Sequence, residues 1–373
     1  MDRFETPPSA SLNRVQIIDL PGLPLDEAVR GLRGDELVSN RVLMALAGEH
    51  ADALGLSADD LPPVTPMLTR SDVRVRDRVS RVVDKALESD NPARRAAAES
   101  IARRLGRNLG WLLVTLHRGD AANRAVRPDW QAADWEQWGA VRRVWLGGGL
   151  SSGRLGEMIA AEARRCLAEL RYGQIEVALS HYRGLIALVG AARTLEARER
   201  TVLGFDFGHT LVKRAVLTYR EGALQQIEPL PPRLADWRAI YPPVDDEAAL
   251  GRSVLAFMTG VICETAAEAP QAEPLAVVSV AAYKQQGRLV GNGPYASIHA
   301  AAGDELADSI LTAAISERAG HSFVVRAIHD GTAAALAHAG TSNAAVIVIG
   351  TALGVGFPPA GQDGLCPSTP QGC

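Results

Sequence analysis

The 373-residue sequence has little cysteine, few aromatic residues and no excess of basic charge. Its four cysteines contain no C-x-x-C pair and are too sparse for a disulfide scaffold, so we expect a protein of the reducing cytoplasm. Lysine and arginine number 39 against 43 aspartate and glutamate, a formal net charge of -4. This balance argues against nucleic acid as the main partner.

Long apolar runs are missing as well. No charged and then apolar leader opens the chain, and no apolar stretch approaches the roughly 20 residues that span a bilayer. We therefore expect a soluble protein with no membrane partner. The length exceeds that of a single hydrophobic core, which predicts two domains.

The stretch that organises the chain is Leu203 to Val216, LGFDFGHTLVKRAV. An apolar strand that contains Asp206 breaks into a polar turn and resumes as a second strand through Lys213. A turn of this kind, beside a strand-borne carboxylate, offers backbone N–H groups to a phosphate and an oxygen to its metal ion. By itself the pattern is equally that of an ordinary polar β-turn. Its turn residues are Gly208, His209 and Thr210.

A second stretch, residues 346–357, repeats this design with a turn at Gly350-Thr351, small residues up to Gly354 and a further strand. Two such turns can bind one phosphate chain from opposite sides. Between them lies FVVRAIHDGTAAAL, in which a β-branched run ends at His329-Asp330 and an alanine-rich helix begins.

A third glycine-rich stretch lies upstream at Val141 to Leu155, VRRVWLGGGLSSGRL. Glycine is required where a backbone approaches a planar or anionic ligand closely. The glycines nearly match the dinucleotide fingerprint G-x-G-x-x-G, but helices precede them in place of a βαβ unit, and the strand at Ile175 to Ser180 ends without a ribose-binding acid. A purely structural glycine turn is a further alternative. The run itself is Gly147, Gly148 and Gly149.

Together these stretches resemble the ROK family of sugar kinases and sugar-responsive repressors, a branch of the actin-like ATPases. In that family the first turn reads roughly D-x-G-G-T, the middle element N-D-x-N-A-A-A and the second turn G-T-G-x-G-G-G. The glycine run is similar to the family's adenosine motif, and Leu105–Gly110 and Leu185–Ala192 resemble the helices that accompany it. The resemblance implies an α/β, two-domain actin-like ATPase (ribonuclease H-like) fold.

The order of the halves differs from that family. The adenosine-type motif precedes the first phosphate turn, and too few residues follow Gly356 to build a second half. We therefore expect a circular permutation, which close chain ends make tolerable. Residues 1–200 would form a helix-rich half, the family's C-terminal half. Residues 201–373 would form an α/β half with both phosphate turns. We also expect the glycine run to face the second turn across one cleft.

The resemblance implies the roles of individual residues. Asp330 would be the general base, and Asp206 would hold Mg²⁺ directly or through water. Asn292 and His329 fall where the family contacts its sugar. Alternatively, Asp330 merely caps the helix that begins near Thr332. ATP and Mg²⁺ are the implied cofactors, and the implied nucleotide-binding set is Asp206, Gly208, His209, Thr210, Lys213, Gly350, Thr351, Gly354, Gly147, Gly148 and Gly149.

Two functions remain open at this level. The first is ATP-dependent phosphorylation of a hydroxyl on a hexose-like or amino-hexose-like sugar, and the second is an actin-like nucleotide-binding protein with a regulatory or conformational role. The intact Asp330 favours the first, and the missing E-x-G-H acceptor motif favours the second. The expected partners are a small sugar-like molecule and, optionally, a second copy of the chain.

Apolar periodicity predicts the remaining elements. Residues 24–116 read as a helical region, 118–138 as a polar connector and 15–19 as a short edge strand. The second half reads as alternating strands and helices: strands at 212–219, 226–230, 275–282 and 344–350, and helices at 247–266 and 304–318, the latter ending at Gly320.

Overall fold

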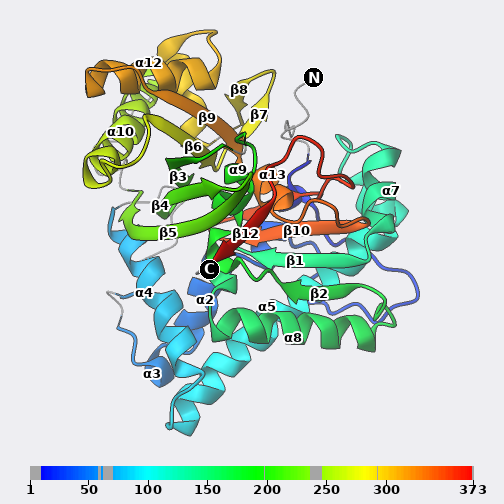
Figure 1. Ribbon diagram of the computed structural model, residues 1–373. Coiled ribbons are helices and arrows are strands. Elements are labelled where there is room, and N and C mark those ends of the chain that lie inside the picture. Colours follow the sequence, from blue (N-terminus) through cyan, green and yellow to red (C-terminus); the bar gives the residue numbers. More distant parts are fainter. Residues whose placement is uncertain are drawn as a thin grey trace. The chain divides into compact units, whose positions relative to one another are not determined.

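The computed structural model describes residues 10–57, 60–61, 70–196, 198–235, 246–291 and 293–371 (Figure 1). Asn292 lies outside these residues. The chain divides into two compact α/β units: unit 1 contains Leu185–Thr341 and Pro358–Cys373, and unit 2 contains Ser9–Gly184 and Ser342–Phe357. This division differs from the predicted one at residue 200, because the second glycine turn belongs to unit 2 with the upstream glycine run.

Unit 1 is built on a six-stranded sheet of order β12-β5-β4-β3-β6-β9. Strands β3, β4 and β5 form an antiparallel meander, while β6 and β9 run parallel to β3. The strands predicted from apolar runs are present, since such runs suit strands covered on both faces. The bounds are β3 (Arg200–Phe207), β4 (Leu211–Arg220), β5 (Ala223–Leu234), β6 (Leu275–Val280), β9 (Val324–His329) and β12 (Ser368–Gln371).

The helices of unit 1 follow the sequence expectations closely. The predicted C-terminal glycine of α12 is confirmed, because Gly320 adopts the left-handed conformation at φ 73. A short hairpin and a 3-10 helix follow β6. The bounds are α9 (Ile186–Ala192), α10 (Glu247–Glu268), β7 (Tyr283–Gln285), β8 (Arg288–Val290), η7 (Pro294–Ser297), α11 (Ile298–Ala302), α12 (Ala307–Ala319) and α13 (Asp330–Leu336).

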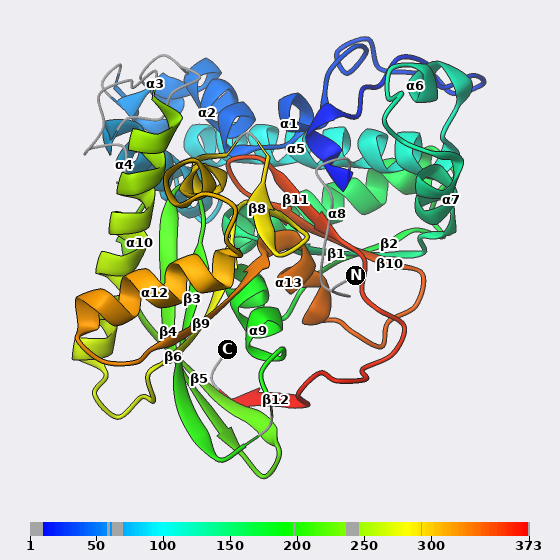
Figure 2. The same cartoon turned by 90° about the horizontal axis from the view of Figure 1, so that it is seen from above.

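Helices α9 and α13 cross at very close range (Figure 2). A Cβ atom on Gly190 would lie 1.6 Å from the carbonyl oxygen of Ala333, so only glycine fits this crossing. The buried guanidinium of Arg193 donates 2.7 Å to the carbonyl of Leu336 at the other end of α13 and 3.1 Å to that of Cys366. These contacts hold α13, the helix that begins with Asp330, against α9 and Arg193.

By length and composition, one helix among the described residues, α10, is apolar enough to cross a membrane. Its Val254, Met258 and Ile262 are buried in the core of unit 1, and the helix packs against α11 and α12. This pattern is that of a core helix and is consistent with a soluble protein.

Unit 2 contains a four-stranded sheet of order β11-β10-β1-β2. Strand β10 is antiparallel to β11 and parallel to β1, which is parallel to β2. Since α8 connects β1 to β2, the glycine run does open a βαβ unit, and the expectation to the contrary is wrong. The bounds are β1 (Arg143–Gly147), η4 (Gly149–Ser151), α8 (Arg154–Glu169), β2 (Glu176–Leu179), β10 (Ala344–Ile349) and β11 (Leu353–Gly356).

The rest of unit 2 is helical, as predicted, with two differences. The polar connector contains helices α6 and α7, and Val15 to Asp19 forms no strand but only a single bridge between Gln16 and Arg33. Val15 is nevertheless fully buried, so its apolar character reflects packing. The bounds are η2 (Leu12–Arg14), α1 (Gly34–Leu37), α2 (Asn40–Glu49), α3 (Ala51–Leu54), α4 (Arg70–Ala86), α5 (Pro92–Arg118), α6 (Ala121–Ala125) and α7 (Ala132–Ala140).

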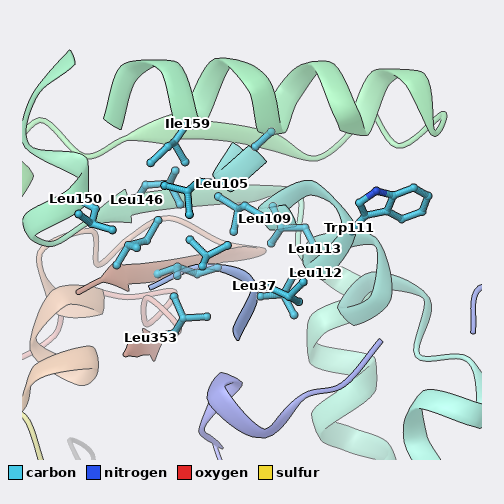
Figure 3. Packing of buried hydrophobic residues seen from close by; sticks show 14 of the residues in the cluster. Leu37, Leu105, Leu109, Trp111, Leu112, Leu113, Leu146, Leu150, Ile159 and Leu353 are labelled. Atoms are coloured by element: carbon cyan, nitrogen blue, oxygen red, sulfur yellow. The ribbon is translucent and has the colours of Figure 1, made fainter. Parts of the chain in front are cut away.

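The core of unit 2 centres on α5 (Figure 3). Leu105 and Leu109 are fully buried, and each such leucine stabilises the fold by about 1.5–3 kcal/mol. On the same helix, a Cβ on Gly106 would lie 2.7 Å from the carbonyl of Ile159 in α8, and one on Gly110 would lie 2.7 Å from Cys166 Cβ. The two glycines, four residues apart, therefore allow α5 and α8 to approach closely.

Four neighbouring strands of the unit 1 sheet, β4-β3-β6-β9, have the same order as the sheet of unit 2, β11-β10-β1-β2. In unit 1, β3 is antiparallel to β4 and parallel to β6, and β6 is parallel to β9. In unit 2, β10 is antiparallel to β11 and parallel to β1, and β1 is parallel to β2. In unit 1 the hairpin comes first along the chain, whereas in unit 2 it comes last. Unit 2 therefore has the topology of unit 1 with its chain order rotated.

Candidate functional site

Three parallel strands of unit 1 end at one edge of the sheet and bring polar side chains together. Asp206 on β3 is in register with Ser279 on β6, which is in register with Ile328 on β9. His329 ends β9, and Asp330, the first residue of α13, lies close enough to Asp206 for the charge of Asp206 to act on it. The carboxyl ends of parallel strands are the usual place for a ligand site in an α/β sheet.

Both oxygens of the Asp206 carboxylate are held. Lys213, directly opposite on β4, places Nζ 2.7 Å from Oδ2, and the Ser279 hydroxyl donates to Oδ1 at 3.1 Å. Asp206 is only 6% exposed, so these contacts compensate its desolvation. Sequence reasoning missed Ser279, although it is the lone polar residue in the apolar run of residues 275–282.

Asp330 is the second carboxylate of this edge. Its side chain is 22% exposed, and its Oδ1 accepts 2.7 Å from the Gly331 N–H. Removal from water, followed by the negative charge of Asp206, raises the pKa of Asp330 to about 7, against the lowering effects of the Gly331 N–H and Lys213. A carboxylate with a pKa near neutrality and an opening to solvent suits proton transfer.

His329 caps helix α13, a role that the sequence had offered to Asp330. Its Nδ1 accepts the Thr332 N–H at 3.2 Å, and its Nε2 lies 3.1 Å from Asp330 Oδ1. The ring stacks on Tyr283, with centroids 4.7 Å apart, and burial lowers the pKa of His329 to about 3, so the ring is neutral at pH 7. Because His329 is only 3% exposed, it is poorly placed for the predicted sugar contact.

The first glycine turn is bonded within itself. The Gly208 N–H donates to the carbonyls of Asp206, at 3.1 Å, and Leu211, at 3.2 Å, and the Tyr295 hydroxyl donates to the Gly208 carbonyl at 2.7 Å. The Gly208 N–H is therefore not available to a phosphate, contrary to the prediction. His209 and Thr210 complete the turn, and the Thr210 carbonyl accepts the Ala235 N–H.

The glycine run of unit 2 separates into a structural glycine and an open one. Gly148 has φ 93, and a Cβ there would lie 2.6 Å from the Ile349 carbonyl on β10. Gly149 is exposed, and a Cβ there would meet nothing within 4 Å. The structural explanation therefore accounts for Gly148, whereas Gly149 is free to approach a ligand.

The second turn lies on the strand next to that run. Gly147 on β1 is in register with Val348 on β10, two residues before Gly350. The two glycine stretches are thus neighbours in one sheet. The sequence had suggested instead that they face each other across a cleft. Gly354 lies in β11, opposite Val348, and not in the turn with Thr351.

Gly350 itself has both a bonded backbone and open space. Its N–H donates to the Ala352 carbonyl at 3.1 Å, and its carbonyl accepts the Asn40 N–H at 2.8 Å. A Cβ on Gly350 would find its nearest atom, the Ala352 oxygen, at 3.8 Å. No packing constraint in the described structure explains this glycine.

Comparison with models of protein families and with curated proteins finds no match for this chain.

Proposed function

We propose that this protein is an ATP-dependent kinase that phosphorylates a hydroxyl group of a sugar or sugar-like substrate. The observation that carries the proposal is the pair of carboxyl groups at the ends of β3 and β9, a charged one that pairs with Lys213 and another with a pKa of about 7. Phosphoryl transfer to an alcohol needs a charged group that binds the cation and a separate group that accepts the proton of the hydroxyl.

The fold supports the same proposal. A doubled sheet, with a glycine turn between the first two antiparallel strands of each copy, is the arrangement implied by resemblance to the ROK family and the actin-like ATPases. The rotated chain order of unit 2 is what a circular permutation of such a protein would produce. We therefore propose that the chain is a permuted member of that superfamily.

The residues present fit a magnesium ion and a nucleotide. Asp206 and Ser279 offer hard oxygen atoms, and Mg²⁺, which retains several waters, needs few protein ligands. Lys213 and Ser279 contact the two oxygens of Asp206, so Asp206 would hold the ion directly in place of one of these contacts or through water. When bound, the ion would neutralise charge on the phosphates. Lys213 contributes a further positive charge in unit 1. Within unit 2 taken by itself, a Cβ on Gly149 or Gly350 would meet no atom closer than 3.8 Å, which leaves space that suits part of a nucleotide.

Asp330 performs the proton transfer in this proposal. Its Oδ1 is held by the Gly331 N–H, which leaves Oδ2 to accept the proton from the substrate hydroxyl as the hydroxyl oxygen attacks the γ-phosphorus. The bond from the γ-phosphorus to the bridging oxygen breaks, and ADP leaves with the electron pair. Positioning and charge neutralisation lower most of the barrier.

One observation favours the alternative, an actin-like nucleotide-binding protein without a small-molecule acceptor. The N–H groups of Gly208 and Gly350 are bonded inside their turns, so each turn has fewer donors for phosphate than the sequence predicted. A coupled ADP-release assay over a panel of hexoses and amino-hexoses distinguishes the two functions. The kinase proposal requires ADP release that depends on one acceptor, together with its phosphorylated product by mass spectrometry.

Acceptor-independent ADP release across the whole panel, or nucleotide binding without turnover, would contradict the kinase proposal and favour the alternative. The matched control is Asp304→Asn, because Asp304 is a carboxylate of unit 1 with a 97% exposed side chain. This variant should behave like the wild type with every acceptor.

A further inference from the structure

Tyr295 packs against the first glycine turn, although it lies in η7, 87 residues after Gly208 along the chain. Its side chain is fully buried, and its hydroxyl donates to the Gly208 carbonyl at 2.7 Å. Its ring meets that of Phe207 edge-on, with centroids 6.2 Å apart, and the ring of His209 lies 6.1 Å away. A phenylalanine would fill the same space, so the hydroxyl calls for an explanation of its own.

The hydroxyl fixes the orientation of one peptide group in the turn. Glycine tolerates more backbone conformations than any other residue, so at Gly208 the orientation is set by hydrogen bonds. The Gly208 N–H donates to the carbonyls of Asp206 and Leu211, and the Gly208 carbonyl accepts from Tyr295. In a planar trans peptide, the N–H of His209 points opposite to the Gly208 carbonyl. Tyr295 therefore determines the direction of the His209 N–H.

That direction is away from Tyr295. Tyr295 is fully buried, whereas Gly208, His209 and Thr210 are half-buried, so the side of the turn that a ligand can reach is the side opposite to Tyr295. Backbone N–H groups of a tight turn bind the oxygen atoms of anions. The Gly208 N–H is used inside the turn, which makes the direction of the next N–H along the chain decisive for such a contact.

We propose that Tyr295 is a positioning residue for phosphate binding: its hydroxyl holds the Gly208 carbonyl and so directs the N–H of His209 toward the phosphates of the nucleotide. This inference rests on the proposed function and deepens it, because it names the side chain that orients the first turn. Without the hydroxyl, Gly208 lets this peptide group rotate, and nucleotide binding has to order it again. The loss should therefore affect the binding of phosphate and not that of adenosine.

The test compares Tyr295→Phe with Tyr219→Phe. Tyr219 is a matched control, since it is also fully buried in unit 1 and also donates at 2.7 Å to a backbone carbonyl, that of Ala192. It lies near the end of β4 that is far from the turn. Each variant leaves one buried carbonyl without this donor, so both should melt about 2–4 °C below the wild type.

Nucleotide binding separates the two variants. By calorimetry with Mg²⁺ present, we expect Tyr295→Phe to bind ATP about 10- to 100-fold more weakly than the wild type, the loss typical of a hydrogen bond to a charged group. Its affinity for adenosine should be unchanged, and Tyr219→Phe should bind both ligands like the wild type. Native ATP affinity in Tyr295→Phe, or an equal loss of ATP affinity in Tyr219→Phe, would overturn the inference.

A second readout needs no nucleotide. The Gly208 N–H donates to Leu211 across the turn, so its hydrogen exchange reports how often the turn opens. NMR of ¹⁵N-labelled protein should show exchange of this amide about 5- to 10-fold faster in Tyr295→Phe than in Tyr219→Phe. Equal exchange in the two variants contradicts the inference even if the protein proves not to be a kinase. The expected losses in Tyr295→Phe, together with a wild type that shows no acceptor-dependent turnover, contradict the proposed function alone.

Discussion

Four strands of each sheet have the same order but carry different chemistry at the ends of the parallel strands. In unit 1 these ends hold the carboxylates Asp206 and Asp330, with Lys213 opposite on the hairpin. In unit 2 the corresponding ends hold the glycines of β1 and the turn at Gly350. The same order of four strands thus carries charged side chains in one unit and glycines in the other, so strand order alone does not determine the chemistry at the strand ends.

Glycine also has two different uses in this structure. Gly190 and Gly148 are fixed by close backbone neighbours, whereas Gly149 and Gly350 have open space around the position of a Cβ. A glycine without a packing reason is the better candidate for a ligand contact, since a close approach of a ligand is the remaining reason to omit a side chain. The predictions below test these contrasts, beginning with the largest expected effect.

Removing the proposed base of unit 1, Asp330, should have the largest effect. In Asp330→Asn we expect kcat to fall by about 10² to 10⁴, because the amide cannot accept the proton. Steady-state phosphorylation of the best acceptor measures this loss, and calorimetry should give an unchanged affinity for ATP. Wild-type turnover in this variant would exclude Asp330 as the base. The α13 cap should survive, since His329 supplies it.

Filling the helix crossing of unit 1 should reduce stability most. In Gly190→Ala the new Cβ would overlap the Ala333 carbonyl, and we expect a loss of about 3 kcal/mol in the free energy of unfolding, measured by urea denaturation. The control is Gly260→Ala in α10, where the nearest atom to a Cβ is the flexible end of Arg318 at 3.4 Å. An equally stable Gly190→Ala protein would contradict the described crossing.

The glycine run of unit 2 offers a sharper test of the same contrast. Gly148→Ala should lower the melting temperature, because φ 93 and the Ile349 carbonyl both oppose a side chain. Gly149→Ala should melt like the wild type and yet bind ATP more weakly, because its methyl group would point into the space proposed for the nucleotide. Calorimetry with ATP and thermal denaturation separate the two effects. Native ATP affinity in Gly149→Ala would remove this glycine from the site.

The pH profile should report the two charged groups that act on Asp330, which are Asp206 and Lys213; His329 nearby is neutral. We expect kcat/KM to fall about tenfold per pH unit below about pH 7, as the base is protonated. Lys213 lowers the pKa of Asp330, so Lys213→Met should shift the acidic limb to higher pH. A shift to lower pH, or none, would show that this lysine does not influence the base.

The last prediction concerns the pH dependence of stability. The pKa of Asp330 is 3.8 in its ordinary state and about 7 in the folded protein, so between these values the folded state holds a proton that the unfolded state releases. The stability that the folded state gains by keeping Asp330 protonated is full below pH 3.8 and is lost as the pH rises through about 7. Asp330→Asn should therefore gain melting temperature relative to the wild type between pH 5 and pH 8. The exposed Asp304→Asn should show no such gain.

Most of the elements could be predicted from the sequence, because apolar runs and periodicity are local properties of the chain. Residues 203–216 do form a hairpin, and α12 does end at Gly320. The helices within residues 118–138 were not predicted, because polar residues surround Trp135 and Trp138 in the sequence. Both tryptophans are buried in the structure, and this packing stabilises helix α7. The strand predicted at residues 15–19 is also absent, because the apolar character of Val15 reflects burial in the core and not strand pairing.

The sequence by itself determined the residue types of the site and their order: two glycine turns, a strand-borne Asp206 and the His329-Asp330 pair. Only the tertiary structure decided what each one does. The register of three strands brings Ser279 to Asp206, the Thr332 N–H selects His329 and not Asp330 as the cap, and burial beside Asp206 raises the pKa of Asp330. These effects depend on distances between segments far apart in the chain, and electrostatic and hydrogen-bonding energies change steeply with such distances.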